Sequence, residues 1–415
     1  MKNNKSNLKF IDPKQIKYNY PLLEKGLSRV DLQKGINVLK TGFITMSKQT
    51  EMFEKEFAKK VKSKYALMVN SGSSANLLAT FASCNPLRKN RFKRGDHALI
   101  PVLCWSTSLW PLVQSGLKIK FVDIDPNTLN INADYLISKI TKKTKVIMLI
   151  NVLGISTDVK KIVNFAKKKQ IIIIEDNCEA LGAKLDQKYL GTMGDFGAYS
   201  FFYSHQITSG EGGMVVCNNK EDYEILLALR SHGWSRGKNT YQKNAKKYPN
   251  LDPRYIFINS GFNLRPTDIQ AAIGRSQFKR LDFFKRTRTM NKSKIINSLI
   301  KDKRWKGQFK FVEYSKRINP SYMVLPILLD IKFLNKKKKF IKLIEEKGLE
   351  TRPIISGSFV NQPSTELYNL NPNNKKFNGA QKVQDLGFVI GLSTKKIDKK
   401  QIDFVTNVLF LIDSV

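Results

Sequence analysis

Two segments without a polar side chain constrain most strongly how this chain can fold. Val146–Ile150 and Ile171–Ile174 are entirely apolar, and the segment 158–169 between them is predicted to be a helix. Strands that are apolar throughout, rather than alternating, are typical of a parallel sheet covered by helices on both faces. The order of strand, helix and strand therefore predicts an α/β fold.

The second apolar segment leads directly into acidic residues. Asp176 follows Ile171–Ile174 after one residue, at the carboxyl end of the predicted strand. Sheets of α/β proteins bind their ligands at this end of the strands, so Asp176 is a candidate ligand group. The alternative is structural, with the carboxylate capping the helix that follows.

A second candidate site lies where the predicted strand Ala66–Asn70 gives way to a helix. The connecting segment Ser71–Leu77 begins with small polar residues, including Gly72 and Ser73. Free N–H groups and the helix dipole make such a helix start a binding site for anions. The alternative is an ordinary serine cap.

Trp105 comes just after another predicted strand, His97–Val102. An aromatic side chain in this position packs into a core more often than it contacts a ligand. Stacking on a flat ligand is the other possibility, and it contributes about 0.5–1.5 kcal/mol beyond burial.

The segment Ala198–Val216 combines an aromatic strand, a polar turn, a Glu-Gly-Gly bend and a second apolar strand. Glycines in such a bend permit positive φ angles or close approach to a ligand. His205 lies in the polar turn and is one of only three histidines in the chain. Imidazole titrates near neutrality, so His205 is a candidate acid–base group. A structural histidine is the alternative.

The length of 415 residues exceeds that of one typical core, so two domains are expected. We predict an N-terminal arm and helix over 1–35, a large domain over 36–290, and a small α+β domain over 291–415. No apolar run approaches the roughly 18 residues of a membrane span, and the N-terminus has no secretory signal, so no membrane partner is expected.

The formal net charge of +38 raises the question of nucleic-acid or membrane binding. The lysines are spread over the whole chain, which favours solvated surfaces over a nucleic-acid site. The four cysteines are scattered without close pairs. This distribution argues against a metal site and fits a reduced, cytoplasmic protein.

Five motifs occur in the order found in the DegT/DnrJ/EryC1/StrS family of sugar aminotransferases, and the chain resembles this family from about residue 20 to the 350s. That family has fold type I of the pyridoxal-phosphate (PLP) enzymes, with a mainly parallel seven-stranded sheet and a small C-terminal domain. The motifs are Ser-Gly-Ser-Ser-Ala, Glu-Asp-Asn-Cys-Glu, Ser-Phe with His and Gly-Glu-Gly-Gly, Gly-Phe-Asn-Leu-Arg, and Glu-Thr-Arg-Pro.

In this family a lysine holds PLP covalently at the position of His205, and a histidine cannot form that bond. The replacement resembles the 3-dehydratase branch, in which the histidine is the catalytic proton shuttle and the cofactor is bound non-covalently. The resemblance also implies roles for other residues. The implied cofactor-binding residues are Gly72, Ser73, Trp105, Asp176, Glu179, Ser200 and Asn263, and the implied substrate-binding residues are His232, Arg236, Glu350 and Arg352.

In the family the asparagine at position 263 reaches the cofactor of the neighbouring subunit, which implies a homodimer with composite sites. The branch implies that PLP accepts an amino group from L-glutamate, giving pyridoxamine phosphate (PMP). PMP then condenses with a nucleotide-diphosphate sugar, GDP-4-keto-6-deoxymannose. Loss of the 3-hydroxyl and hydrolysis give a 4-keto-3,6-dideoxy sugar for lipopolysaccharide O-antigen synthesis.

Three alternatives remain open. One is a nucleotide-sugar 4-aminotransferase. Another is a CDP-4-keto-6-deoxyglucose 3-dehydratase, although that branch carries an iron–sulfur cluster and residues 218–260 contain no cysteine. The third is a catalytically inactive member of the fold that acts as a scaffold or basic binding module.

Overall fold

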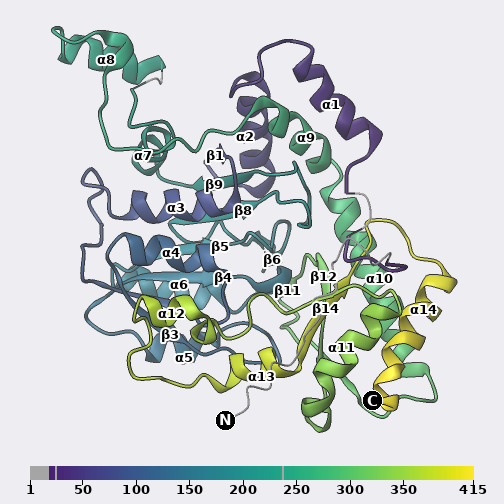
Figure 1. The fold of residues 1–415 in the computed structure, drawn as a ribbon. Helices are drawn as coiled ribbons and strands as arrows, with labels where there is room; N and C mark the ends of the chain where they lie inside the picture. The colour runs from purple at the N-terminus through teal and green to yellow at the C-terminus, as the bar shows by residue number, and fades with distance from the viewer. Residues whose placement is uncertain (1–17, 24–25, 236–237) are drawn as a thin grey trace, which may run out of the picture.

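The structure is a computed structural model that describes residues 18–23, 26–235 and 238–415, without the side chains of 238–241. A seven-stranded sheet in the order β1-β9-β8-β5-β4-β2-β3 forms its centre (Figure 1). Strands β2, β3, β4, β5 and β8 pair in parallel, whereas β9 is antiparallel to β1 and β8. The strands are β1 (Tyr65–Val69), β2 (His97–Pro101), β3 (Lys118–Val122), β4 (Thr144–Ile150), β5 (Ile172–Asp176), β8 (Phe196–Ser200) and β9 (Gly213–Cys217).

The apolar runs are buried on both faces of this sheet, as their lack of polar residues predicts. Ile172 and Ile174 point into one hydrophobic cluster, and Ile171 and Ile173 into another. Successive side chains of a strand point to opposite faces, so a strand covered on both sides needs an apolar residue at every position. The α/β fold predicted from these runs is confirmed.

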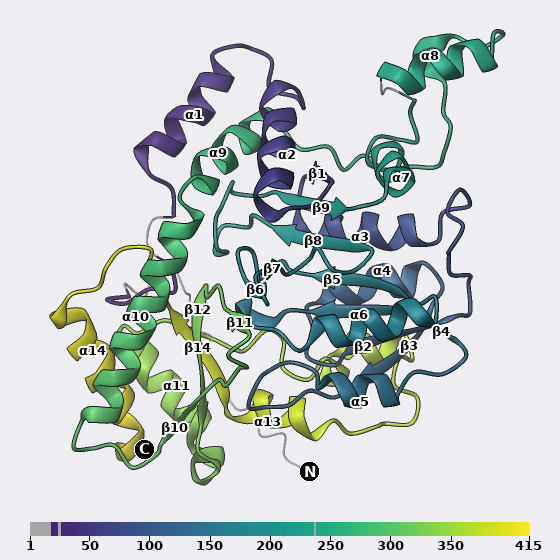
Figure 2. The ribbon, with the colours of Figure 1, turned by 180° about the vertical axis from the view of Figure 1, so that it is seen from behind.

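Helices cover both faces of the large sheet (Figures 1 and 2). One face packs on α3, α4 and α7, and the other on α5 and α6, with α2, α9 and α10 beside β1, β8 and β9. The bounds are α2 (Lys48–Val61), α3 (Gly72–Ser83), α4 (Ser106–Gln114), α5 (Ala133–Ser138), α6 (Val159–Lys168), α7 (Lys220–Arg230), α9 (Asp268–Phe278) and α10 (Leu281–Lys301), with the 3-10 turns η1 (Val152–Gly154) and η2 (Pro253–Tyr255).

A second, antiparallel sheet in the order β10-β12-β14-β13 lies beside the first. Its apolar side chains pack with residues of α10, α11 and α14, which Figure 2 shows next to this sheet. The elements are β10 (Phe309–Phe311), β12 (Val324–Leu329), β13 (Thr351–Arg352), β14 (Gly387–Gly391), α11 (Lys337–Glu346), α12 (Pro363–Leu367), α13 (Asn378–Leu386) and α14 (Lys399–Leu409), with the 3-10 segments η3 (Ile331–Lys336), η4 (Phe359–Asn361) and η5 (Phe410–Ser414). A third, small sheet joins β11 (Ile318–Asn319), β6 (Lys184–Leu185) and β7 (Lys188–Tyr189).

The long helix α10 connects the two larger sheets and runs without interruption across residue 290. The domain limits of 1–35, 36–290 and 291–415 therefore remain a prediction. Residues 1–17 of the predicted arm lie outside the described part. Residues 18–23 run along the second sheet, where Tyr20 pairs with Leu349.

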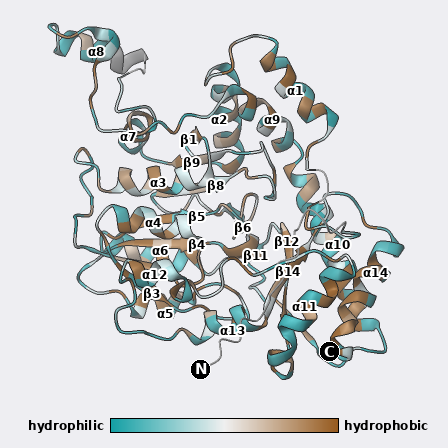
Figure 3. Ribbon diagram, in the orientation of Figure 1, coloured by the Kyte–Doolittle hydropathy of each residue, from teal (hydrophilic) through white to brown (hydrophobic). Residues whose placement is uncertain are grey.

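Helices α1 (Arg29–Leu39) and α8 (Lys238–Lys247) lie at the periphery (Figure 1). Figure 3 shows hydrophobic residues along α1, and Val30, Leu32, Ile36 and Leu39 are all exposed. Neighbouring α2 has the same kind of pattern but buries Phe53 and Phe57. Within the described residues, every helix is too short or too polar to cross a bilayer.

Candidate active site

A cavity of about 610 Å³ lies at the carboxyl ends of the parallel strands, between the two larger sheets. The predicted residues that line it come from separate parts of the chain. Those of the large sheet meet here because the carboxyl ends of its parallel strands share one edge, and Arg352 is added by β13 of the second sheet. The predicted lining residues are Gly72, Ser73, Trp105, Asp176, Glu179, Ser200, His205 and Arg352.

The start of α3 forms one wall. Ser71 caps the helix by accepting a hydrogen bond from the Ser74 N–H, so the structural role considered for this serine is real. A Cβ atom on Gly72 would lie 2.5 Å from Cβ of Ser200, and only glycine fits this contact. The helix start therefore lies directly against the end of β8, with its N-terminal dipole beside the cavity.

Asp176 ends β5 and lines the cavity with a carboxylate that accepts three hydrogen bonds. Its Oδ2 atom accepts bonds of 2.7 Å from the Asn76 amide and 2.7 Å from the Ser108 hydroxyl, and its Oδ1 atom accepts the Cys178 N–H at 3.0 Å. These donors hold the carboxylate in one orientation. The capping alternative is wrong, because β5 is followed by a turn and not by a helix, and the N–H that Oδ1 accepts belongs to this turn.

His205 lies in the segment between β8 and β9. Its Nδ1 atom is buried without a hydrogen-bond partner among the described residues. Burial lowers the pKa of the imidazole to about 4, against an opposing effect of the Asp176 charge. The imidazole is therefore neutral at physiological pH, which is the form that can accept a proton.

Glu179 lies on the turn after β5 and accepts the Leu153 N–H at 3.1 Å. Burial raises the pKa of its carboxyl to about 7, and the nearby Asp176 charge acts in the same direction. A carboxyl that titrates near neutrality beside a ligand cavity is typical of functional sites.

Trp105 and Arg352 both line the cavity, from the connection before α4 and from β13. The Trp105 side chain is 58% exposed, so it is not the core residue that its position after a strand would favour. Arg352 pairs with Glu350 at 2.6 Å, and Glu350 also accepts the Leu22 N–H at 2.7 Å. Glu350 thus lies behind Arg352 rather than in the lining.

Two further predicted residues do not line the cavity, and a third cannot be placed. Asn263 and His232 are both exposed, and Asn263 accepts a bond from Arg265 at 3.1 Å. Arg236 lies outside the described residues. The roles assigned to these residues by resemblance remain predictions.

The sequence did not reveal three residues that support the site. Asn76 and Ser108 orient Asp176 from α3 and α4, and Arg288 of α10 donates to the backbone carbonyls of His205 and Gln206. A buried asparagine within the Ala/Leu-rich helix α3 was the one available signal. No local pattern marks a contact between α10 and a loop more than 80 positions earlier.

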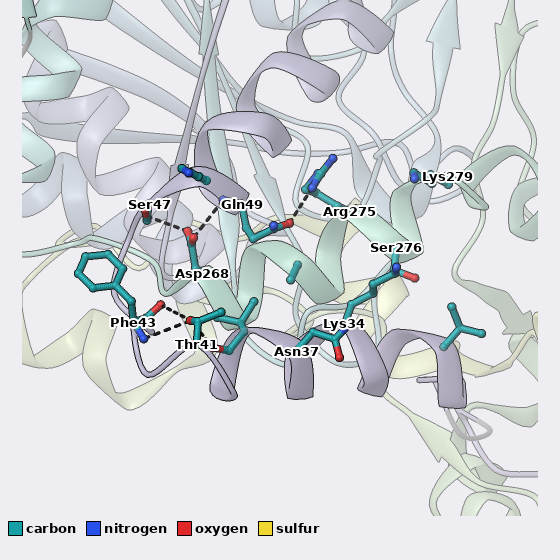
Figure 4. A pocket seen from close by; sticks show the side chains of 14 residues that line it. Lys34, Asn37, Thr41, Phe43, Ser47, Gln49, Asp268, Arg275, Ser276 and Lys279 are labelled. Atoms are coloured by element: carbon teal, nitrogen blue, oxygen red, sulfur yellow. Dashed lines mark hydrogen bonds between the residues drawn. The ribbon is translucent and has the colours of Figure 1, made fainter.

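A second cavity, of about 840 Å³, lies between α1, α2 and α9 and contains none of the predicted site residues (Figure 4). Asp268 lies at its edge and caps α2, accepting the Ser47 N–H at 2.7 Å and the Gln49 N–H at 3.0 Å. Among the described residues, including those of both cavities, no group of three or more His, Cys, Asp and Glu side chains is arranged to hold a metal ion.

The family model of the DegT/DnrJ/EryC1/StrS aminotransferases matches residues 28–409 of this chain. The chain belongs to this family. It is 36% identical over 350 residues to GDP-4-keto-6-deoxy-D-mannose 3-dehydratase of Yersinia pseudotuberculosis, covering 84% of this chain and 87% of that protein.

Solved structures show the same fold, which is fold type I of the PLP-dependent aminotransferases. The Escherichia coli GDP-4-keto-6-deoxy-D-mannose 3-dehydratase with bound hydrated PLP superposes with a TM-score of 0.85 at 32% identity, covering 95% of this chain and 100% of that one. A GDP-4-keto-6-deoxymannose 3-dehydratase with a trapped PLP-glutamate geminal diamine gives 0.82 at 30% identity, covering 94% and 100%. The predicted family and fold are confirmed.

The residues of the cavity fit the cofactor of this PLP-binding family. Gly72 lets the start of α3 lie against the end of β8, and the free N–H groups of this helix N-terminus line the cavity, where they suit a phosphate group. The fixed Asp176 carboxylate suits a protonated pyridine nitrogen, and the exposed Trp105 ring suits an aromatic ligand. The unpartnered Nδ1 of His205 completes a set of groups that a flat, polar and anionic molecule would satisfy.

Proposed function

We propose that the protein is a PLP- and PMP-dependent sugar 3-dehydratase, a hydro-lyase that removes the 3-hydroxyl of GDP-4-keto-6-deoxymannose with L-glutamate as amino donor. One observation carries the proposal. His205 lines the cavity, and no lysine is found among the described residues that line it. Without an amine to bond to it, the cofactor must be held by shape and charge.

The chain's own residues divide the work. PLP or PMP supplies, when bound, a ring that accepts electrons from an adjacent carbon. Asp176 is assigned to the ring nitrogen, because an oriented carboxylate keeps that nitrogen protonated. Gly72, Ser73 and Ser200 are assigned to the phosphate, and Trp105 to the face of the ring.

His205 is assigned to the proton transfer at the carbon beside the ring. Its neutral imidazole takes the proton as a base and returns one as an acid when the 3-hydroxyl leaves as water. Unlike a lysine amine, the imidazole cannot displace the sugar from the cofactor by forming its own covalent bond. Glu179, with a pKa of about 7, is assigned to the cofactor side of the same cavity.

The sugar nucleotide is assigned to the opening formed by Trp105 and the second sheet. Arg352, oriented by its pair with Glu350, offers a positive charge to the diphosphate or the sugar. His232 and Arg236 are assigned to the same ligand from a neighbouring subunit, together with Asn263 for the cofactor phosphate. This requires a homodimer, and the exposed apolar residues of α1 supply a surface that a second copy would cover. Action in the cytoplasm and a role in O-antigen synthesis are parts of this proposal.

The test combines purified protein with PLP, glutamate and GDP-4-keto-6-deoxymannose. We expect ammonia release in step with loss of the 3-hydroxyl, and no turnover by His205→Asn. A stable 4-amino sugar would instead identify an aminotransferase. Preference for the CDP-linked 4-keto-6-deoxyglucose would identify the other dehydratase, and absence of both PLP binding and turnover would favour the inactive scaffold.

A further inference from the structure

We infer that Arg288 is a positioning residue for His205, holding the backbone of the segment that carries the imidazole. Arg288 belongs to α10, is only 2% exposed and does not line the cavity. The inference rests on the function proposed above, since it presupposes that His205 transfers a proton. It concerns a residue that neither the sequence motifs nor the cavity identifies.

The guanidinium of Arg288 donates hydrogen bonds only to backbone carbonyls. It reaches the carbonyl oxygens of Gln206 at 2.9 Å, His205 at 3.3 Å and Leu392 at 3.1 Å. The ion pairs found among the described residues do not include Arg288. Burying a cation without a carboxylate is costly, so its presence here calls for a role beyond packing.

The three carbonyls belong to two parts of the molecule. His205 and Gln206 follow β8 of the large sheet, and Leu392 follows β14 of the second sheet. Gln206 is also held by its side-chain amide, which donates to the carbonyls of Glu179 and Ser321. Arg288 thus connects the His205 backbone to the region where the two sheets meet, and fixes the direction from which the imidazole enters the cavity.

The charge of Arg288 has a second effect on the same ring. Burial lowers the pKa of the guanidinium to about 10, so it remains protonated at neutral pH. A fixed positive charge near His205 disfavours the imidazolium, in the same direction as burial. The other titratable groups lining the cavity around His205 are Asp176, Cys178, Glu179, Glu211 and Arg352.

Two substitutions separate position from charge. Arg288→Lys keeps the charge but cannot reach three carbonyls at once, whereas Arg288→Gln removes the charge. We expect Arg288→Lys to lower kcat by about 10- to 100-fold, as displacement of a catalytic group does, with KM for the sugar nucleotide changed less than about twofold. Unchanged kcat in Arg288→Lys would overturn the inference.

The imidazole itself can be observed without turnover. The chain has three histidines, so selective isotope labelling gives few imidazole signals in an NMR spectrum, and His97→Asn and His232→Asn assign them. In Arg288→Gln we expect the His205 signal to change position and its titration midpoint to rise. In Arg288→Lys we expect a changed position with a midpoint close to wild type. A His205 signal identical to wild type in both variants would also overturn the inference.

Matched controls come from the same helix. Arg286→Gln removes an exposed charge two positions away, and Asn291→Ala removes bonds to the carbonyls of Ser393 and Lys395 without touching the His205 segment. Both should leave the His205 signal and kcat near wild type. Dehydration by His205→Asn would refute the proposed function, whereas the NMR result for Arg288 does not depend on turnover.

Discussion

The side-chain amide of Asn76 donates a 2.7 Å hydrogen bond to the Asp176 carboxylate. The oxygen of the same amide is buried without a partner among the described residues. A buried hydrogen bond to a charged group contributes about 1.5–3 kcal/mol. We therefore predict that Asn76→Ala weakens PLP binding by about 10- to 100-fold, measured by fluorescence titration. Asn85→Ala, which removes a buried amide just beyond the other end of α3, should bind PLP like wild type.

The contact between Gly72 and Ser200 predicts an effect on both stability and binding. An alanine at position 72 would place its Cβ atom 2.5 Å from Cβ of Ser200 and 2.8 Å from Sγ of Cys178. Such overpacking costs about 1–3 kcal/mol, so Gly72→Ala should lower the free energy of unfolding in urea and weaken PLP binding. Gly26→Ala is the control, because its Cβ would meet its nearest atom at 3.4 Å. Equal behaviour of the two variants would contradict this prediction.

The raised pKa of Glu179 predicts how stability depends on pH. The unfolded chain ionises this carboxyl near its ordinary pKa of 4.5, whereas the folded chain keeps the proton until about pH 7. The folded state binds more protons in this window, so the contribution of Glu179 to stability is full below pH 4.5 and is lost as the pH rises to 7. Between pH 4.5 and pH 7 the free energy of unfolding of the wild-type protein should therefore fall by up to about 3 kcal/mol relative to that of Glu179→Gln. Parallel pH curves for the two proteins would rule this out.

Replacement of the imidazole by an amine should change how the cofactor is held. His205→Lys places a primary amine in a cavity that has none among its described lining residues. We predict that PLP then remains on the protein after dialysis, with a new visible absorbance, while dehydration falls by about 100-fold or more. His232→Lys, on an exposed side chain, should lose PLP on dialysis as wild type does. Loss of PLP from His205→Lys would argue against the assignment of position 205.

The exposed face of α1 predicts an effect of charge on assembly. Leu39 and Ile36 are 54% and 42% exposed, beside the exposed Phe43. If a second copy covers this face, Leu39→Glu should raise the dimer dissociation constant by about 100-fold, since it buries an unpaired charge. Sedimentation equilibrium measures this constant. Leu367→Glu is the control. It alters an apolar residue on α12 that is 79% exposed, and it should leave the dimer dissociation constant unchanged.

Local sequence patterns predicted the strands and the positions of several lining residues. Asp176, Ser200 and Gly72 lie at or just after strand ends, and parallel strands bring those ends together whatever the rest of the chain does. The predicted helix 158–169 agrees within one residue at each end with α6. These features follow from periodicity and from the geometry of a parallel sheet.

Other features depend on contacts that no local pattern encodes. Apolar residues recur along both α1 and α2, yet α2 buries Phe53 and Phe57 whereas most apolar residues of α1 are exposed, because periodicity identifies an apolar face but not what covers it. The contact of Arg288 with His205 depends on how α10 packs between the two sheets. The placement of His232 and Asn263 away from the cavity could not be foreseen either, because it depends on the path of the chain beyond α7.

The segment that carries His205 leaves and re-enters the sheet at a single point. Ser200 of β8 pairs with Gly213 of β9, and the Phe201 N–H donates to the Gly212 carbonyl at 2.8 Å. Both ends of the segment 201–212 are therefore held by hydrogen bonds between the same two strands. If His205 carries out the proton transfer proposed above, the group that decides the chemistry lies outside the ladder, so a substitution there can alter the reaction and leave the sheet unchanged.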